Sequence, residues 1–156
     1  MKRLWYNFMW NKNRMYITEL LFLKKVKNRD IKEFMERNGL FMKVLMFNGS
    51  PKAKGCTYTA LEEMAMVLNE EGIDTEIMHI GAQPQGSCMG CGGCSETGEC
   101  IYGGAVVEAA KKLQEADGVV FGSPVHYASV SGNLMGFMHR LSWSAGKYLK
   151  YKPAAM

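Results

Sequence analysis

From residue 43 onward, two kinds of segment alternate along the chain. Short apolar runs cover residues 44–47 and 118–121, and a Gly-Ser-Pro sequence follows closely behind each of them. Runs of this kind predict buried parallel strands, because both faces of such a strand are covered by helices. The more polar segment 74–80 predicts another strand that is partly exposed.

Between these strands, apolar residues recur at helical spacing. The pattern predicts helices over residues 57–71, 106–116 and 132–150, and a long loop over residues 81–104. The alternation of strands and helices is typical of an α/β protein with a parallel sheet and right-handed crossovers. We therefore expect a doubly wound sheet with the strand order 2-1-3.

The composition excludes several classes of protein. Of the 156 residues, 47% are hydrophobic and 22% are charged, so we expect one domain with a sizeable core and no bulk disorder. No apolar stretch approaches the roughly 18 residues that a membrane-spanning helix needs. The N-terminus lacks a continuous apolar region and a small-residue cleavage site, so we expect no signal peptide.

The positive charge is confined to one end of the chain. Residues 1–42 carry ten Lys and Arg against four acids, a net charge of +6, whereas the remainder carries −2. A uniformly basic nucleic-acid binder would not have this distribution. We expect residues 1–42 to be a basic extension, disordered or partly helical, before a domain at residues 43–156. A basic arm that contacts a membrane or RNA is the alternative.

The first candidate site follows the first predicted strand. The sequence Asn-Gly-Ser-Pro-Lys at residues 48–52 leads into a helix at Thr57. Such a turn presents free N–H groups and the positive end of the helix dipole to an anion. Ser50 and Thr57 could hydrogen-bond a phosphate, and Lys52 or Lys54 could offset its charge. An ordinary strand-to-helix turn is the alternative interpretation.

The second candidate site is the loop at residues 122–132, after the last predicted strand. In open α/β sheets, ligands bind at the carboxyl ends of the strands, where the strand order reverses. With the order 2-1-3, the loops after the first and third strands meet there and face one crevice. Tyr127 and His126 could flank a planar ring, although His126 alone is typical of a surface residue.

Four of the five cysteines cluster in one Gly-rich segment. Two residues separate Cys88, Cys91 and Cys94 from one another, and Cys100 follows after five more. An odd total of five cysteines, four of them clustered, suits metal ligation in a reducing compartment better than a disulfide framework. It resembles the ferredoxin cysteine run, except that the last spacing is longer, and favours an iron–sulfur cluster. Tetrahedral zinc and a loop of free thiols are the alternatives.

Taken together, these motifs resemble the NADPH-dependent FMN reductase family of flavodoxin-like proteins. The matching sequences are Asn-Gly-Ser-Pro-Lys at 48–52, Gly-Cys-Thr at 55–57, Gly-Ser-Pro-Val-His-Tyr at 122–127 and Ser-Gly at 131–132. The resemblance covers about residues 43–156, and the cysteine spacing is similar to the family's iron–sulfur flavoprotein branch. It implies a flavin-dependent oxidoreductase, in which FMN takes electrons from NAD(P)H and passes them to a quinone, an iron–sulfur cluster or another acceptor.

The resemblance also implies roles for particular residues. The residues that would hold the FMN phosphate are Ser50, Lys52, Cys56 and Thr57. Cys56 stands where the family commonly has Asn. The residues that would border the flavin ring are Pro124, Val125, His126 and Tyr127. The ligands of a 4Fe-4S cluster would be Cys88, Cys91, Cys94 and Cys100. No side chain is required as an acid or base, because the flavin does the chemistry.

One departure from the family concerns the sheet. The family has five strands in the order 2-1-3-4-5, whereas this sequence predicts three. We expect strands 4 and 5 and the last flavin loop to be absent from a truncated chain. Residues 118–121 would then have no fourth strand beside them.

Two other functions stay open at this level. One is a non-enzymatic electron carrier with the same cofactors, and the other is a zinc- or thiol-based redox-sensing module. In each case we expect a cytoplasmic protein whose partners are small-molecule or protein electron acceptors rather than nucleic acids or membranes. The resemblance further implies a homo-oligomer in the full-length family.

Overall fold

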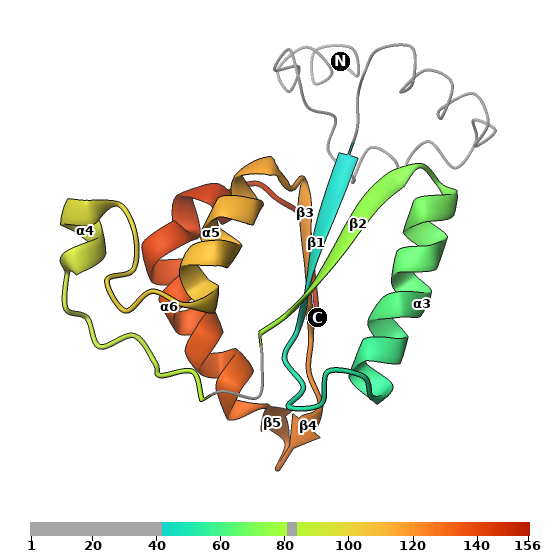
Figure 1. Cartoon of the computed structure of the whole chain (residues 1–156), viewed down its shortest axis with the longest axis horizontal. Coiled ribbons are helices and arrows are strands. Elements are labelled where there is room, and N and C mark those ends of the chain that lie inside the picture. Colours follow the sequence, from blue (N-terminus) through green and yellow to red (C-terminus); the bar gives the residue numbers. More distant parts are fainter. Residues whose placement is uncertain (1–41, 81–83) are drawn as a thin grey trace, which may run out of the picture. The chain divides into compact units, whose positions relative to one another are not determined.

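Strand β1 (Met42–Asn48) lies inside the sheet, and six of its seven residues are buried. The computed structural model describes residues 42–80 and 84–156. In it, β1 pairs in parallel with β2 (Ile73–His79) on one side and with β3 (Gly118–Gly122) on the other (Figure 1). The predicted order 2-1-3 is therefore confirmed, and the fold is α/β of the flavodoxin-like type.

A short fourth strand, β6 (Ala154–Ala155), extends the sheet to the order β2-β1-β3-β6. It runs parallel to β3, with Val119 opposite Ala154 and Val120 opposite Ala155. The N–H of Val119 also donates to the carbonyl oxygen of Pro153 at 3.0 Å. The expectation that residues 118–121 have no strand beside them was therefore wrong, because two small residues suffice to form this pairing.

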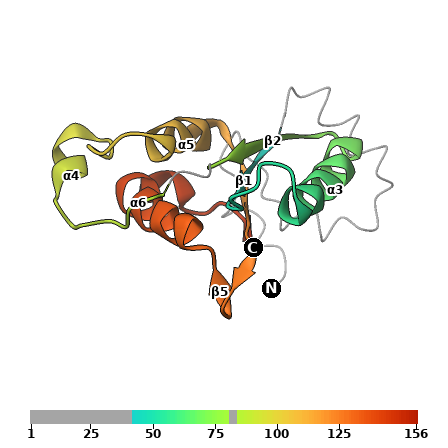
Figure 2. The ribbon, with the colours of Figure 1, turned by 60° about the horizontal axis from the view of Figure 1, so that its bottom comes forward.

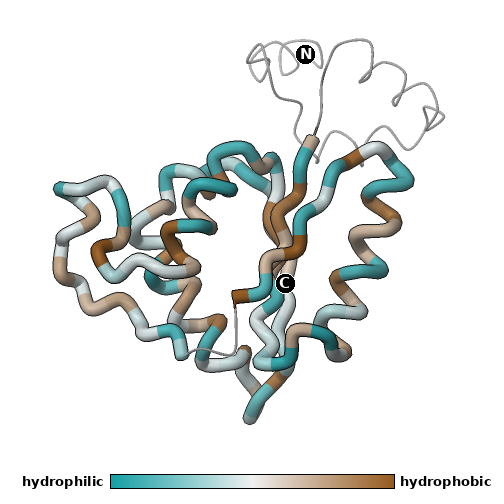
Figure 3. Tube along the Cα trace, viewed as in Figure 1, coloured by the Kyte–Doolittle hydropathy of each residue, from teal (hydrophilic) through white to brown (hydrophobic). Residues whose placement is uncertain are grey.

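Helices cover both faces of the sheet (Figures 1 and 2). Helix α3 (Cys56–Glu70) packs on one face, whereas α5 (Ala105–Glu115) and α6 (Gly132–Leu149) pack together on the other. Side chains of a strand alternate between faces, so β1 serves both layers. Its four residues 44–47 are all buried, which explains the continuous apolar run in the sequence and the hydrophobic central strands in Figure 3.

The layer under α5 and α6 holds an aromatic cluster. Phe47 is fully buried, and its ring lies 5.2 Å from that of Phe121 and 5.0 Å from that of Phe137. Burial of such a side chain stabilises the fold by roughly 1.5–3 kcal/mol. This cluster joins β1, β3 and α6, the three elements whose ends carry the candidate sites.

An ion-pair network lies on the outer part of this layer. The carboxylate of Glu76 on β2 contacts Lys43 Nζ at 2.7 Å and Lys112 Nζ at 2.6 Å. The hydrogen bonds from Lys112 and Lys43 hold the pKa of Glu76 below its ordinary value. Lys112 also pairs with Glu108 on its own helix. Half-exposed pairs of this kind contribute little stability each, but they link β1, β2 and α5.

The predicted helices match the observed ones within one or two residues. Besides β6, two further features were not predicted: α4 (Gly93–Thr97), inside the predicted cysteine loop, and a hairpin of β4 (Val125–His126) with β5 (Ser129–Val130). Helix α4 is too short for a periodic pattern and lies between Gly92 and Gly98, both with positive φ. The predicted extension at residues 1–42 lies outside the described residues, except for Met42. No helix in the described ranges has the length and hydropathy to cross a membrane.

Candidate functional site

The first candidate loop, residues 49–55, is organised by one buried amide side chain. Asn48, the last residue of β1, is fully buried. Its Oδ1 accepts a hydrogen bond from the N–H of Ser50 at 3.0 Å, and its Nδ2 donates to the carbonyl oxygen of Ala53 at 3.1 Å. The two ends of this amide therefore hold both sides of the loop in a fixed turn.

A second anchor of the same loop comes from the end of β2. His79 Nε2 lies 2.8 Å from the carbonyl oxygen of Ser50, and with the proton on that nitrogen the ring donates to the oxygen. The Ser50 side chain is buried, and its Oγ accepts from the N–H of Lys52 at 3.2 Å. These contacts give His79 a structural role.

The phosphate-binding residues predicted from the sequence lie on this loop and on the start of α3. Lys52 and Cys56 are exposed, whereas Thr57 is half-buried. Helix α3 begins after Gly55 without a side-chain cap, and its first turn contains no acidic residue. Its first N–H groups and its positive dipole end are therefore available to an anion. The donors present suit a phosphate group.

Two backbone-directed hydrogen bonds bring the second candidate loop against the first. The N–H of Gly49 donates to the carbonyl oxygen of Gly122 at 2.8 Å, and Ser131 Oγ donates to the carbonyl oxygen of Gly49 at 2.7 Å. Ser131 also caps α6, since its Oγ accepts from the N–H of Leu134. The loops after β1 and β3 therefore meet at the carboxyl ends of the strands, as the sheet order predicted.

The second loop contains a tight hairpin with an unusual turn. Strands β4 and β5 are joined by Tyr127 and Ala128, whose φ angles are 50° and 63°. Positive φ at both central residues is the mark of a type I′ turn, which usually contains Asn or Gly. Val125, His126 and Tyr127 are exposed at this hairpin. A strained, exposed turn of this kind is typical of a binding loop.

We expect Ala128→Gly to stabilise the protein. An L-residue in the left-handed region costs about 1–2 kcal/mol, and glycine removes that cost while adding some chain entropy. The free energy of unfolding should therefore rise by about 0.5–1 kcal/mol. The control is Ala60→Gly at an exposed position of α3, which should lower it by about 0.5–1 kcal/mol. Urea unfolding measures both changes, and equal losses in the two variants would contradict the strain argument.

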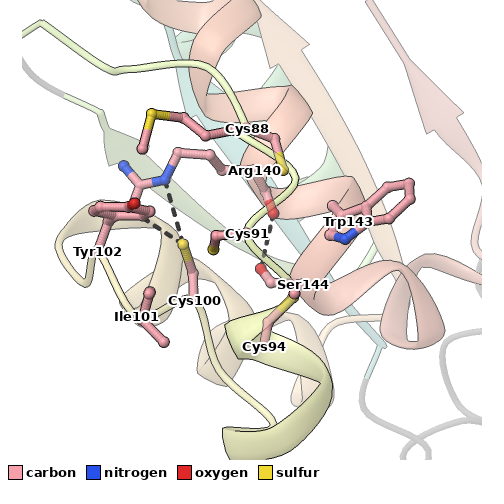
Figure 4. Close-up of a pocket in the computed structure, with 11 residues that line it drawn as sticks. Cys88, Cys91, Cys94, Cys100, Ile101, Tyr102, Arg140, Trp143 and Ser144 are labelled. Atoms are coloured by element: carbon pink, nitrogen blue, oxygen red, sulfur yellow. Dashed lines mark hydrogen bonds between the residues drawn. The ribbon is translucent and has the colours of Figure 1, made fainter.

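The four clustered cysteines line one pocket between the cysteine loop and α6 (Figure 4). Arg140, Trp143 and Ser144 of α6 form the other wall. Cys56 is exposed at the start of α3 and does not line this pocket. The structure thus brings together the thiols of Cys88, Cys91, Cys94 and Cys100.

The segment that precedes Cys88 in the cysteine loop lies close to α6. A Cβ at Gly136 would lie 2.1 Å from the carbonyl oxygen of Gln85, so only glycine permits this approach. Three residues further along α6, His139 Nδ1 lies 2.7 Å from Ser87 Oγ. The backbone leading to Cys88 is therefore fixed against the helix before it reaches the pocket.

Two kinds of metal centre are bound by four cysteine thiolates. Zinc needs its thiolates to converge on one ion at about 2.3 Å. Within residues 42–80 and 84–156, no three His, Cys, Asp or Glu side chains converge closely enough to hold a single metal ion. A 4Fe-4S cluster instead spreads its four thiolate ligands around a larger group, one to each iron. The four cysteines that line the pocket match the number of ligands that such a cluster requires.

The fold and these two candidate sites define a class: a flavodoxin-like protein with a loop suited to an anion and a cysteine cluster. The model of the NADPH-dependent FMN reductase family matches residues 42–156. The chain therefore belongs to this family of flavin-dependent reductases.

Known relatives agree with the family assignment. An iron-sulfur flavoprotein of Methanocaldococcus jannaschii is 39% identical over 99 residues, which are 64% of this chain and 51% of that protein. An iron-sulfur flavoprotein of Clostridioides difficile is 30% identical over 115 residues, which are 72% and 51% of the two chains. The chain thus spans about half the length of the curated relatives it matches.

A solved structure supports the fold. The NAD(P)H:quinone oxidoreductase from Methanothermobacter marburgensis superposes with a TM-score of 0.53 at 20% identity. The match covers 68% of this chain and 55% of that one. At this identity, the similarity concerns the arrangement of strands and helices alone.

Sequence reasoning missed four residues that organise the sites: Asn48, Ser131, His79 as a loop anchor, and Arg140. Asn48 and Ser131 were visible as polar residues directly at the end of a strand and the start of a helix. Arg140 had a weaker signal, because it stands three residues after Phe137 on the apolar face of α6. A cation on such a face indicates a buried partner.

Proposed function

We propose that the protein is a flavin-dependent oxidoreductase that binds FMN at the two joined loops and a 4Fe-4S cluster at the cysteine pocket. The observation that carries this proposal is the meeting of the loops after β1 and β3 through Gly49, Gly122 and Ser131. Thr57, at the uncapped start of α3, lies next to Gly122, from which the second loop begins.

The first loop is proposed to hold the FMN phosphate. Ser50 and Thr57 offer hydroxyl donors, and the start of α3 offers backbone N–H groups. The exposed ammonium group of Lys52 supplies positive charge. Asn48 and His79 hold the loop in shape beforehand, so less conformational entropy is lost on binding. Cys56 adds a thiol at the position where the family commonly has Asn.

The second loop is proposed to border the flavin ring. Pro124, Val125, His126 and Tyr127 lie in or beside the exposed hairpin, where a planar ligand can contact them. When bound, FMN would accept a hydride from NAD(P)H and deliver electrons to an acceptor. The side chains of the hairpin orient the ring and exclude water from one of its faces.

The cysteine pocket is proposed to hold the 4Fe-4S cluster, with Cys88, Cys91, Cys94 and Cys100 as ligands. When bound, the cluster would relay single electrons between the flavin and a quinone or another acceptor. The apolar side chains of Met89, Ile101 and Trp143 lie beside these ligands. The location that we propose is cytoplasmic, because a clustered cysteine motif suits metal ligation in a reducing compartment.

The test is an anaerobic purification of the full chain with analysis of flavin, iron and sulfide. The proposal expects FMN and four irons with four sulfides per chain, and oxidation of NADH or NADPH when a quinone is added. Flavin and cluster without nicotinamide oxidation would instead indicate an electron carrier. A colourless, zinc-loaded protein would contradict the proposal and favour the redox-sensing module.

We expect Thr57→Ala to weaken FMN binding about tenfold or more. A hydrogen bond to a charged group contributes about 1.5–3 kcal/mol, and each 1.4 kcal/mol changes the Kd tenfold. Thr59→Ala is the matched control, because Thr59 lies on the same helix turn but is exposed and donates to the carbonyl oxygen of Gly55. Fluorescence titration with FMN gives the Kd. Equal affinity in the two variants would refute the assignment of Thr57.

A further inference from the structure

Arg140 is the most deeply buried cation in the part of the chain that the structure describes. It lies on α6, and only 9% of its surface is exposed. Its Nε and Nη2 atoms lie 3.4 and 3.3 Å from Cys100 Sγ and donate to it, and Nη2 also donates to the carbonyl oxygen of Gly103 at 2.8 Å. Figure 4 shows the guanidinium directed at this sulfur.

The charge of Arg140 needs a counter-charge. A buried guanidinium loses its hydration, and that loss is normally offset by a carboxylate or another anion. Among residues 42–80 and 84–156, Arg140 forms no ion pair with Asp or Glu. Its nearest polar partners are Cys100 Sγ and a carbonyl oxygen, and the ring of Tyr102 lies 5.9 Å away. The metal-bound thiolate of the proposed cluster would balance this charge, because Cys100 Sγ is in direct contact with the guanidinium.

We propose that Arg140 is a positioning residue that holds Cys100 as the fourth cluster ligand and raises the reduction potential of the cluster. This inference rests on the proposed function, since it assumes the cluster at the cysteine pocket. The spacing of the cysteines alone does not predict this role for Arg140.

The direction of the effect follows from electrostatics. A cluster with four thiolate ligands is an anion, and it becomes more negative by one charge when it takes up one electron. A nearby fixed cation and N–H···S hydrogen bonds stabilise the more negative form more strongly. The two contacts from Arg140 to one sulfur thus favour the reduced cluster. Removing them should shift the reduction potential to a more negative value.

The fork geometry of arginine explains why this residue serves the purpose. One guanidinium contacts the sulfur through two nitrogens and the carbonyl oxygen of Gly103 through one of them. Lysine offers a point charge without this fixed geometry. The backbone of Arg140 is itself fixed in α6, where its carbonyl oxygen accepts a hydrogen bond from Ser144 Oγ at 2.8 Å.

The experiment compares wild type, Arg140→Gln, Arg140→Lys and the control Lys147→Gln. Lys147 lies on the same helix but is exposed, and its ammonium group faces the ring of Tyr148. Each protein is purified anaerobically and titrated with dithionite in the presence of redox mediators. Electron paramagnetic resonance follows the reduced cluster. These readings do not depend on turnover with NAD(P)H.

At a fixed potential, Arg140→Gln should lower the ratio of reduced to oxidised cluster at least tenfold. For a one-electron couple, this corresponds to a negative shift of about 59 mV or more. Arg140→Lys should shift in the same direction by less, with changed resonance positions, and Lys147→Gln should match the wild type. Unchanged potentials in both Arg140 variants would overturn the inference.

Two further outcomes are also decisive. If Arg140→Gln retains no iron, the inference is tested by Arg140→Lys alone. An unchanged reduction potential and an unchanged resonance spectrum in Arg140→Lys would then overturn the inference. If the wild type itself holds flavin but no iron–sulfur cluster, the proposed function of the cysteine pocket fails. That failure is distinguishable, because it appears before any variant is made.

Discussion

Replacement of Cys100 by alanine is expected to remove the iron–sulfur cluster from the protein. The four thiols line one pocket, and a 4Fe-4S cluster needs one thiolate for each iron. Cys100 is also the only one of the four for which the described residues show a hydrogen bond from a buried cation. Iron and sulfide per chain should fall by tenfold or more, while FMN should still bind at the separate joined loops.

The matched control for Cys100 is Cys56→Ala. Cys56 is an exposed cysteine at the start of α3 and does not line the pocket. Iron and sulfide contents should therefore stay at the wild-type level in this variant. Full iron and sulfide in Cys100→Ala would show that the fourth ligand is misassigned. Full iron in alanine variants of all four clustered cysteines would exclude the cluster altogether.

Replacement of Asn48 is expected to have the largest effect on FMN. Its buried amide makes two hydrogen bonds across the first loop, to the N–H of Ser50 and the carbonyl oxygen of Ala53. Asn48→Ala leaves both backbone groups without this partner, at a cost of about 1–3 kcal/mol for each. We expect the free energy of unfolding to fall by about 2–4 kcal/mol and FMN affinity to fall roughly 100-fold, since each 1.4 kcal/mol changes the Kd tenfold.

Two variants make this test specific. Asn48→Asp keeps the size of the side chain and the acceptor for Ser50, but loses the donor to Ala53 and adds a buried negative charge near the phosphate site. It should weaken FMN at least as much as Asn48→Ala. Asn69→Ala, at an exposed position of α3, should change stability by less than about 0.5 kcal/mol. Submicromolar FMN binding by Asn48→Asp would contradict the proposed loop function.

Much of the fold was predictable because its strands and helices repeat a simple pattern over many residues. Residues 44–47 are apolar on both faces because α3 and the pair α5 and α6 cover both. The sheet order then places the two motif-bearing loops together, so the meeting of Gly49 with Gly122 followed from topology. A strand that is buried on both faces requires several consecutive apolar residues, and such a run can be recognised in a single sequence.

The elements that were missed depend on contacts that leave no such pattern. The turn at Tyr127 and Ala128 takes positive φ without Gly or Asn, and β6 consists of two alanines. Arg140 is charged, so the sequence alone favours an exposed position for it. In the structure, its hydrogen bonds to Cys100 and Gly103 keep the side chain buried. In these cases, residues distant in sequence decide the local structure.

Helix α6 also fixes the distance between the two proposed sites. Ser131 caps it at the joined loops, and Arg140 faces the cysteine pocket nine residues later in the sequence, an axial rise of about 14 Å at 1.5 Å per residue. A single inserted residue between them would add about 1.5 Å and rotate Arg140 by about 100° away from Cys100. This stretch of the helix should therefore tolerate substitutions at its exposed positions, but not insertions or deletions.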